Sequence, residues 1–408
     1  MSKPIVVGVD TQRGDAHSIR VIVAGGGVAG LEAVLALQAL AGDRTTIELL
    51  TPERHFTYRP LAVAEPFMSG RVQRFPFSAI GADRGVRVHR DALAHVLPDA
   101  YMVETQEGAR LGYDVLILAL GARAVEAVSG AITFRGPQDA GRVRAVVDSL
   151  RRGDMHRVAF IVPPDATWTL PMYELALQTA RAVRPVAAGA ELTVLTPEPF
   201  PLAGFGQAAT TEVEMLLDSH GVRLHTGAEV DEVAAGRVWM GSGGSFRVDC
   251  AIALPQLIGP RPRGVPCDRL GFVPVDEYAR ALGVDGVFAC GDVAAHSVKQ
   301  GGLATQQADV AAAVIAADAG VAVTPRPYQP VLRGLLLTGE TARFMRNDHA
   351  GEPELAEEPL WWPGAKIAGR HLAPYLATHL DLAVASARWL TTGGRESEPP
   401  PRCLERSS

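Results

Sequence analysis

The stretch from Arg20 to Leu40, RVIVAGGGVAGLEAVLALQAL, decides the fold. It begins with a short β-branched run, which is typical of a buried strand, and it ends with apolar residues at helical spacing. Between them, Gly25, Gly27 and Gly30 form the pattern G-x-G-x-x-G. Directly after a strand and before a helix, this pattern predicts a turn that binds the pyrophosphate of a dinucleotide.

Each residue of this turn has an expected role. Gly25 permits the tight turn, Gly27 lets the backbone approach a pyrophosphate, and Gly30 allows the helix to pack closely on the strand. Val28 and Ala29 begin the helix, whose first N–H groups then face the phosphates. The alternative is that the glycines serve only the turn.

A second apolar strand, TIELLTPE from Thr46 to Glu53, completes a βαβ unit of about thirty residues. Dinucleotide folds of this kind carry an acid at the end of that strand, which binds a ribose hydroxyl. Here Thr51 occupies the place, and Glu53 lies two residues beyond it. We expect Glu53 to bind the ribose; an exposed loop carboxylate is the alternative.

A weaker copy of the unit follows later in the chain. RVAFIV at 157–162 precedes a helical stretch and then ELTVLTPE at 191–198, which ends like the first copy. The sequence therefore predicts an α/β fold with two Rossmann-like dinucleotide-binding domains. Between the copies, residues 88–123 alternate apolar and polar side chains, which predicts a small antiparallel sheet that returns to a buried strand at 115–120.

The expected organisation has four parts. A proline cluster at 325–330 marks a boundary, and a hairpin around Gly339 and Glu340 opens a C-terminal α+β cap with a polar end. The expected segments are a leader at 1–17, a first domain at 18–133 plus 251–325, a second domain at 134–250, and the cap at 326–408.

Composition narrows the function. Of 408 residues, 47% are apolar and 21% charged, and the net charge of −6 offers no basic field for nucleic acid. The four cysteines show no C-x-x-C spacing, so neither a metal site nor a disulfide framework is indicated. No apolar run approaches the roughly 18 residues of a membrane span, and the start lacks a signal-peptide pattern. We expect a cytoplasmic protein.

Two further motifs accompany the glycine turn in the same order as in a known family. Tyr113-Asp114 leads into LILALGAR, which contains Ala119 and Gly121, and GVFACGDVAA contains Gly291 and Asp292. Across roughly residues 18–325 the chain resembles the FAD-dependent pyridine nucleotide-disulfide oxidoreductase superfamily, nearest its type II NADH dehydrogenase and sulfide:quinone oxidoreductase branches.

The resemblance implies bound FAD and a role for each matching residue. Ala119 and Gly121 would lie along the FAD, and Gly291 and Asp292 would hold its ribityl chain. Arg59 and Pro60 follow the second strand where relatives bring the chain against the isoalloxazine ring; a rigid proline turn is the alternative. These assignments are expectations from the family pattern.

The start of the helix that follows residue 300 carries two further expectations. In relatives its start, here Lys299 and Gly302, points at the flavin pyrimidine edge, where a reduced flavin carries negative charge that an ammonium would stabilise. An ordinary surface lysine is the alternative. Residues 304–307, ATQQ, resemble part of a quinone-binding segment of type II NADH dehydrogenases, and a simple helix face is the alternative.

Glu174 matches a glutamate found near the flavin in relatives and would relay protons. The alternative is that it is only a charge at a helix start.

The chain departs from its relatives at the second dinucleotide fold. Its strand runs into PPDATWTLP at 163–171, with no glycine, so the usual NAD(P)H site looks lost. Trp168 occupies the position of a redox cysteine in sulfide:quinone oxidoreductases. We therefore expect NADH, NADPH and sulfide all to reduce the flavin poorly, and a quinol, an organic hydride donor or a partner redox protein to serve instead.

The tail stretch LWWPGAKIAGRHLAPYLATHL at 360–380 resembles a segment near the quinone end of sulfide:quinone oxidoreductases. Its paired tryptophans could rest on a membrane interface at the inner face, or pack against the flavin domain or a partner in a homodimer. The leading interpretation is an enzyme that passes two electrons through FAD to a quinone or another small-molecule acceptor. The alternatives are an NAD(P)H-dependent reductase and a flavin-holding protein without turnover.

Overall fold

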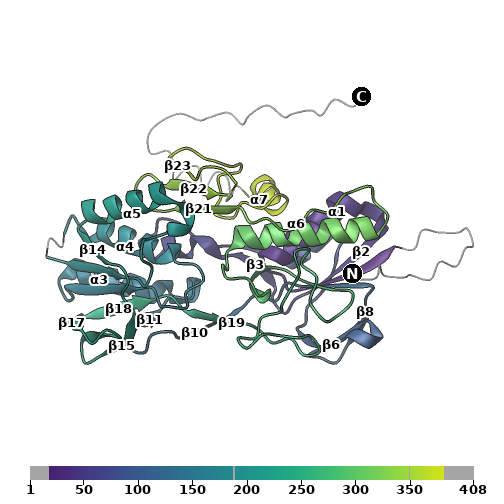
Figure 1. Ribbon diagram of the computed structural model, residues 1–408, viewed down its shortest axis with the longest axis horizontal. Coiled ribbons are helices and arrows are strands. Elements are labelled where there is room, and N and C mark those ends of the chain that lie inside the picture. Colours follow the sequence, from purple (N-terminus) through teal and green to yellow (C-terminus); the bar gives the residue numbers. More distant parts are fainter. Residues whose placement is uncertain (1–17, 187–188, 349, 381–408) are drawn as a thin grey trace, which may run out of the picture.

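The computed structural model of the protein describes residues 18–186, 189–348 and 350–380. Two parallel five-stranded sheets occupy the two halves of an elongated molecule (Figure 1). This arrangement confirms the predicted α/β fold with two Rossmann-like domains. The expected leader at 1–17 and the expected polar end beyond residue 393 lie outside the described residues.

The first sheet is built around the strand that precedes the glycine turn. Its order is β20-β9-β1-β2-β5, with every neighbouring pair parallel. The strands are β1 (Ile19–Ala24), β2 (Thr45–Leu50), β5 (Arg87–His89), β9 (Val115–Leu118) and β20 (Val287–Ala289). Helices α1 (Val28–Ala41) and α6 (Gly301–Asp318) run side by side over one face (Figure 1) and share its apolar core.

Shorter elements surround this sheet. The predicted antiparallel sheet is formed by β6 (Leu93–Leu97), β7 (Met102–Thr105) and β8 (Arg110–Gly112), and it leads into the buried strand β9 as expected. After β2, the chain forms the hairpin strands β3 (His55–Tyr58) and β4 (Gln73–Pro76), joined through the 3-10 helix η2 (Arg59–Phe67), and then helix α2 (Phe77–Arg84). Three-residue 3-10 helices are η1 (Gly42–Arg44), η3 (Pro98–Ala100), η4 (Pro137–Asp139), η5 (Ala203–Phe205) and η6 (Gly291–Val293).

The second sheet repeats the first, in the order β11-β18-β12-β13-β14. Its strands are β11 (Ile132–Thr133), β12 (Arg157–Ile161), β13 (Glu191–Leu195), β14 (Val222–His225) and β18 (Cys250–Ala253). Helices α3 (Ala140–Arg152), α4 (Leu170–Val183) and α5 (Gln207–Ser219) share its core. A small antiparallel sheet of β15 (Val230–Ala234), β16 (Arg237–Met240) and β17 (Ser245–Arg247) completes this half.

The two halves match in their hydrogen bonds as well as in their strands. The Thr51 N–H donates to the His89 carbonyl at 2.9 Å, and the Thr196 N–H donates to the His225 carbonyl at 3.0 Å. Aspartates at the same place of each half, Asp114 and Asp249, likewise accept from the backbone N–H that opens the central strand. The likeness of the two TPE ends in the sequence therefore reflects a repeated structure.

Two segments cross between the halves. They pair as an antiparallel ribbon of β10 (Arg123–Val125) and β19 (Gln256–Ile258). The expected domain boundary at 133/134 lies at the end of β11, and that at 250/251 lies within β18, which pairs with β11 in the second sheet. The chain passes from one half to the other at this ribbon, and the domain boundaries stay a prediction.

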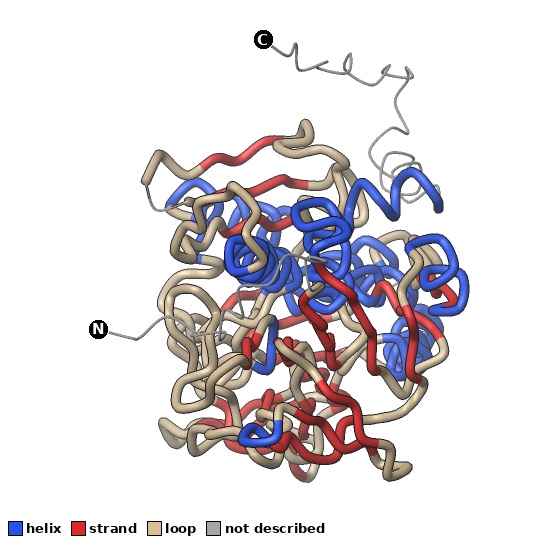
Figure 2. Tube along the Cα trace, turned by 90° about the vertical axis from the view of Figure 1, so that its right-hand side faces the viewer, coloured by secondary structure: helices blue, strands red, loops and turns tan. Residues whose placement is uncertain are grey.

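The C-terminal part lies over the helices, at the top of both Figure 1 and Figure 2. Strands β21 (Leu332–Leu336) and β22 (Arg343–Asn347) form the predicted hairpin, with β23 (Glu354–Ala356) added at its edge and helix α7 (Leu372–Leu380) at its end. Within the described chain, no helix is long and apolar enough to cross a membrane.

Candidate functional site

The glycine turn between β1 and α1 is required by its surroundings. Gly25 adopts a φ of +114°, and a side chain there would overlap the Ala119 carbonyl. A side chain on Gly30 would overlap the Gly25 carbonyl, whereas one on Gly27 would meet only open space. Because no side chain caps α1, its first N–H groups, including those of Val28 and Ala29, stay available to a phosphate at that open place.

The two other motifs meet this turn. Gly291, at a φ of +78°, would place a Cβ atom 3.0 Å from that of Ala29, so η6 must begin with glycine in order to approach α1. Gly121, at a φ of +70°, follows Ala119 at the end of β9. The structure thus brings together three segments that the sequence separates by more than 250 residues, in a cradle that suits an extended dinucleotide such as FAD.

Glu53 lies exposed beyond the end of β2, while Thr51 is buried. The strand end therefore points the threonine inward and leaves the glutamate at the surface. Its assignment to a ribose stays a prediction.

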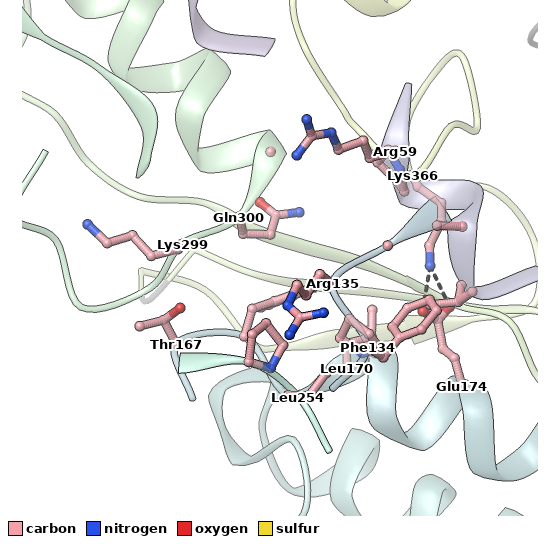
Figure 3. Close-up of a pocket in the computed structure, with 18 of the residues that line it drawn as sticks. Arg59, Phe134, Arg135, Thr167, Leu170, Glu174, Leu254, Lys299, Gln300 and Lys366 are labelled. Atoms are coloured by element: carbon pink, nitrogen blue, oxygen red, sulfur yellow. Dashed lines mark hydrogen bonds and ion pairs between the residues drawn. The ribbon is translucent and has the colours of Figure 1, made fainter. Parts of the chain in front are cut away.

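A cavity of about 300 Å³ lies where the two halves face each other (Figure 3). Arg59, Pro60, Asp292 and Lys299 line it from the first half, so four expected cofactor or catalytic residues gather at one place. Gly302 lies in the first turn of α6, behind the lining residue Gly301. The second half and the C-terminal part supply the opposite wall, whose members include Phe134, Arg135, Trp168, Leu170, Glu174, Leu254 and Lys366.

Asp292 and Lys299 influence each other at the first-half side of the cavity. Burial raises the pKa of Asp292, while the charges of Lys299 and Arg59 oppose the rise. Burial also lowers the pKa of Lys299 to about 8, against the raising influence of Asp292. Only 5% of Lys299 is exposed, which rules out the surface alternative.

The Lys299 side chain does not reach into the middle of the cavity. Its ammonium contacts the Ala294 carbonyl and lies 3.9 Å from the centroid of the Phe272 ring. Figure 3 shows it directed away from the other labelled side chains. Any action on the flavin would therefore be electrostatic, without a direct part in proton transfer.

Glu174 forms a buried ion pair that the sequence did not reveal. The Lys366 ammonium donates to both carboxylate oxygens at 2.6 Å (Figure 3), and the Leu337 N–H donates to one of them at 2.8 Å. Glu174 is fully buried and the Lys366 side chain is 7% exposed. Burial raises the pKa of Glu174, and Lys366 opposes that rise. The only hint in the sequence is that lysines are rare, with Lys3, Lys299 and Lys366 in the whole chain.

The segment that carries Lys366, residues 363–372, is here called the strap. Its Ile367 N–H donates to the Tyr58 hydroxyl at 3.0 Å, and its His371 and Leu372 N–H groups donate to the Glu32 carboxylate at 2.7 Å each. Since Glu174 belongs to the second half and the other two acceptors to the first, the strap ties both halves together over the cavity.

The carboxylate at the end of β13 in the second half is occupied by hydrogen bonds within the protein. Glu198, the counterpart of Glu53, accepts hydrogen bonds from the hydroxyls of Tyr173 at 2.6 Å, Thr196 at 3.0 Å and Thr169 at 3.1 Å. These hydroxyls satisfy the carboxylate that would otherwise be free for a ribose. Trp168 packs edge-on against Phe205, with 5.9 Å between ring centroids.

Comparisons with known proteins agree with this fold. Residues 174–313 match the family model for pyridine nucleotide-disulphide oxidoreductase. The NADH dehydrogenase-like protein MT1860 of Mycobacterium tuberculosis is 30% identical over 300 residues, which cover 68% of this chain and 73% of that protein. The ferredoxin–NAD(+) reductase component of the biphenyl dioxygenase system of Paraburkholderia xenovorans is 28% identical, with 69% of each chain covered.

Among solved structures, the sulfide:quinone oxidoreductase of Aquifex aeolicus is similar in fold, with a TM-score of 0.75 and 19% identity. The match covers 91% of this chain and 92% of that one, and so includes the C-terminal part.

Proposed function

The chain belongs to the pyridine nucleotide-disulphide oxidoreductase family, and we propose that within this family it passes two electrons through bound FAD to a quinone. One observation carries the proposal: the cradle formed by the glycine turn, Ala119–Gly121 and Gly291–Asp292 opens into a cavity that holds a buried ion pair. When bound, FAD supplies the two-electron redox chemistry. The first N–H groups of α1 would hold its pyrophosphate, and Asp292 its ribityl hydroxyls.

Glu174 would relay from solvent, one at a time, the two protons that such a reaction needs. Reduction of a quinone to a quinol consumes two electrons and two protons. Glu174 can hold a proton in a site shielded from water, because burial raises its pKa, and Lys366 keeps the carboxylate in place. The carboxyl group would pass its proton to a quinone oxygen in the cavity.

The walls of the cavity suit an apolar ring. Trp168, Leu170 and Leu254 give an apolar surface beside the ion pair, as expected for a site that takes a flat, weakly polar acceptor. The sulfide:quinone oxidoreductase with a similar fold acts, by its name, on a quinone. An exposed side chain in the C-terminal part, Trp362 at 61%, supports a peripheral membrane contact there.

NADH and NADPH are poor donors in this proposal. Pro163 and Pro164 remove two backbone donors from the place of the phosphate turn, and the carboxylate that would bind the ribose is already satisfied. Sulfide is a poor donor for a different reason, since none of the cysteines in the described residues lines the cavity. A quinol, an organic hydride donor or a partner redox protein would meet the flavin directly.

An NAD(P)H-dependent reductase is the second candidate, and the name of the mycobacterial relative favours it. The two candidates make opposite predictions in anaerobic stopped-flow mixing of the FAD-loaded protein. We expect a quinone to reoxidise the chemically reduced flavin, and little bleaching of the oxidised flavin by NADH, NADPH or sulfide. Bleaching by micromolar NADH within milliseconds would overturn the proposal and establish the reductase. Absence of both bleaching by any donor and reoxidation by a quinone would favour a flavin-holding protein without turnover.

A further inference from the structure

A second cavity, of about 530 Å³, lies apart from the ion pair. Here it is called the arginine cavity. It is bounded by the β3–β4 hairpin, by η2 and the loop that follows it, and by η4 at the start of the second half. Its lining residues are Thr57, Arg59, Glu65, Arg71, Val72, Arg74, Pro137 and Gln138.

The hairpin register explains why the arginines gather there. Thr57 pairs with Arg74 across the ladder, so both side chains lie on one face, and Arg59 and Arg71 flank the same end of the hairpin. Phe56 and Tyr58 point the other way into the core, because side chains alternate along a strand. The opposite face of the hairpin therefore carries arginine side chains.

The charge in this cavity is not neutralised by the protein. Arg71 and Arg74 form no ion pair or hydrogen bond in the described part of the chain. Glu65 is the one acidic lining residue, and one of its oxygens already accepts from the Val72 N–H at 2.9 Å. Three arginines against one carboxylate leave a net charge of about +2, in a chain whose net charge is −6.

The wall formed by η2 is held in position. Arg144 of α3 donates to the Glu65 carbonyl at 2.8 Å and to the Pro66 carbonyl at 3.2 Å, which fixes η2 against the second half. Unpaired guanidinium groups on a fixed wall are suited to oxyanions, since each can donate two parallel N–H groups. The volume lies in the range of small-molecule sites.

We propose that the arginine cavity binds a multivalent oxyanion, a small molecule that carries phosphate or several carboxylate groups, with Arg71 and Arg74 as its main ligands. Thr57 and Gln138 would add hydrogen bonds. Arg59 lines both the arginine cavity and the cavity that holds the Glu174–Lys366 pair, so the ligand would lie next to the latter cavity without entering it. Figure 3 shows the Arg59 guanidinium directed away from this ion pair. The proposal does not depend on the electron donor or acceptor.

The test is a calorimetric titration of the FAD-loaded full-length protein, in a phosphate-free buffer of low ionic strength. Inorganic pyrophosphate and citrate serve as separate probes, one for each class of oxyanion. Because the flavin's own pyrophosphate fills the cradle, a probe must bind elsewhere. We expect saturable binding of one equivalent, weakened at least about tenfold by Arg71→Gln or Arg74→Gln and further by both.

Two controls separate a built site from diffuse attraction. Arg110→Gln removes an equal charge from the exposed strand β8 and should leave the affinity unchanged. The Arg71→Lys, Arg74→Lys double variant keeps the charge but lacks the paired N–H donors of the guanidinium groups, and it should bind with intermediate affinity. Tighter binding of pyrophosphate would assign a phosphorylated ligand, and tighter binding of citrate a polycarboxylate. The proposal would be overturned if neither probe bound saturably, or if Arg110→Gln lost as much affinity as Arg71→Gln or Arg74→Gln.

Discussion

Asp292 and Lys299 stand seven residues apart and act through charge on the same part of the cleft. Burial destabilises the charged form of both, so each depends on the other to stay ionised. A site that keeps two opposite charges at such a cost is typical of function, because a structural role could be met by apolar residues. The two residues therefore carry the sharpest predictions about the cofactor.

Replacing Asp292 with alanine should release FAD. The carboxylate is the acceptor that the family pattern places at the ribityl hydroxyls, and no other lining residue near η6 is acidic. The flavin-to-protein ratio, read from the absorbance of the purified protein, should fall well below that of the wild type. Asp285→Ala, an exposed change seven residues earlier, should keep full flavin. Full occupancy in Asp292→Ala would contradict the assignment.

Replacing Lys299 with methionine, which keeps its length, should lower the flavin midpoint potential by tens of millivolts. Loss of about 1.4 kcal/mol of stabilisation of the reduced form corresponds to roughly 30 mV for two electrons. Since the pKa of Lys299 is about 8, the difference from the wild type should be largest below pH 8 and shrink above it. Spectroelectrochemical titration at pH 6.5 and 9.5 measures it. Equal potentials at pH 6.5 would show that the ammonium is too far away.

At the scale of elements, α1, α6 and α7 meet at a cluster of Glu32, Asp309 and His371. One side-chain oxygen or nitrogen atom of each residue lies within 4.8 Å of those of the other two. The Glu32 carboxylate also accepts hydrogen bonds from the two backbone N–H groups at the start of α7. Burial, followed by the charge of Glu32, raises the pKa of Asp309 to about 8, while Arg370 lowers it. This pKa favours a protonated Asp309 beside the Glu32 carboxylate at neutral pH, where the three helices meet.

This proton makes stability depend on pH. A raised pKa means that the folded state binds the proton more tightly than the unfolded chain, so the stabilisation is complete below about pH 4 and is lost as the pH rises through about 8. Between pH 6 and 9 the melting temperature of the wild type should fall by at least about 3 °C more than that of Asp309→Asn.

Differential scanning calorimetry of the two proteins checks this, with Asp43→Asn as an exposed control that should follow the wild type. Parallel curves for the wild type and Asp309→Asn would show that Asp309 does not hold a proton at neutral pH.

At the scale of the whole molecule, the strap decides how the two halves are held. It reaches α1 through Glu32, β3 through Tyr58 and α4 through Glu174, so one short segment fixes the geometry of the cavity. Two of the three attachments use buried carboxylates, and removing the partner of a buried carboxylate strongly destabilises a protein.

Lys366→Met should therefore destabilise the protein by about 3–5 kcal/mol, because it leaves Glu174 buried and unpaired. Adding Glu174→Gln should restore most of the stability, yet quinone reduction should remain slow without the carboxyl proton. Urea unfolding and steady-state assays measure the two effects. Glu340→Gln, which breaks an exposed pair with Arg181 at 2.9 Å, should change neither. A Lys366→Met protein as stable as the wild type would rule out a structural ion pair.

The amino-acid sequence alone determined the local parts of this protein. The turn at Gly25–Gly30, the strand before it, the helix after it and the hairpin at β21–β22 are confirmed, because glycine requirements, apolar periods and turn residues act within a few positions of the chain. The absence of a glycine turn before α4 was equally visible. Family membership followed from three such local motifs.

Tertiary structure alone decided what meets at the cavity. The Glu174–Lys366 pair joins residues 192 apart, and two of the hydroxyl groups around Glu198 come from the start of α4, 25 and 29 residues away. No periodic pattern in the sequence indicates either set of contacts, because a long-range contact depends on how whole elements pack and not on neighbouring residues. The same holds for the arginine cavity, where hairpin register and the position of η4 place cations that the sequence scatters.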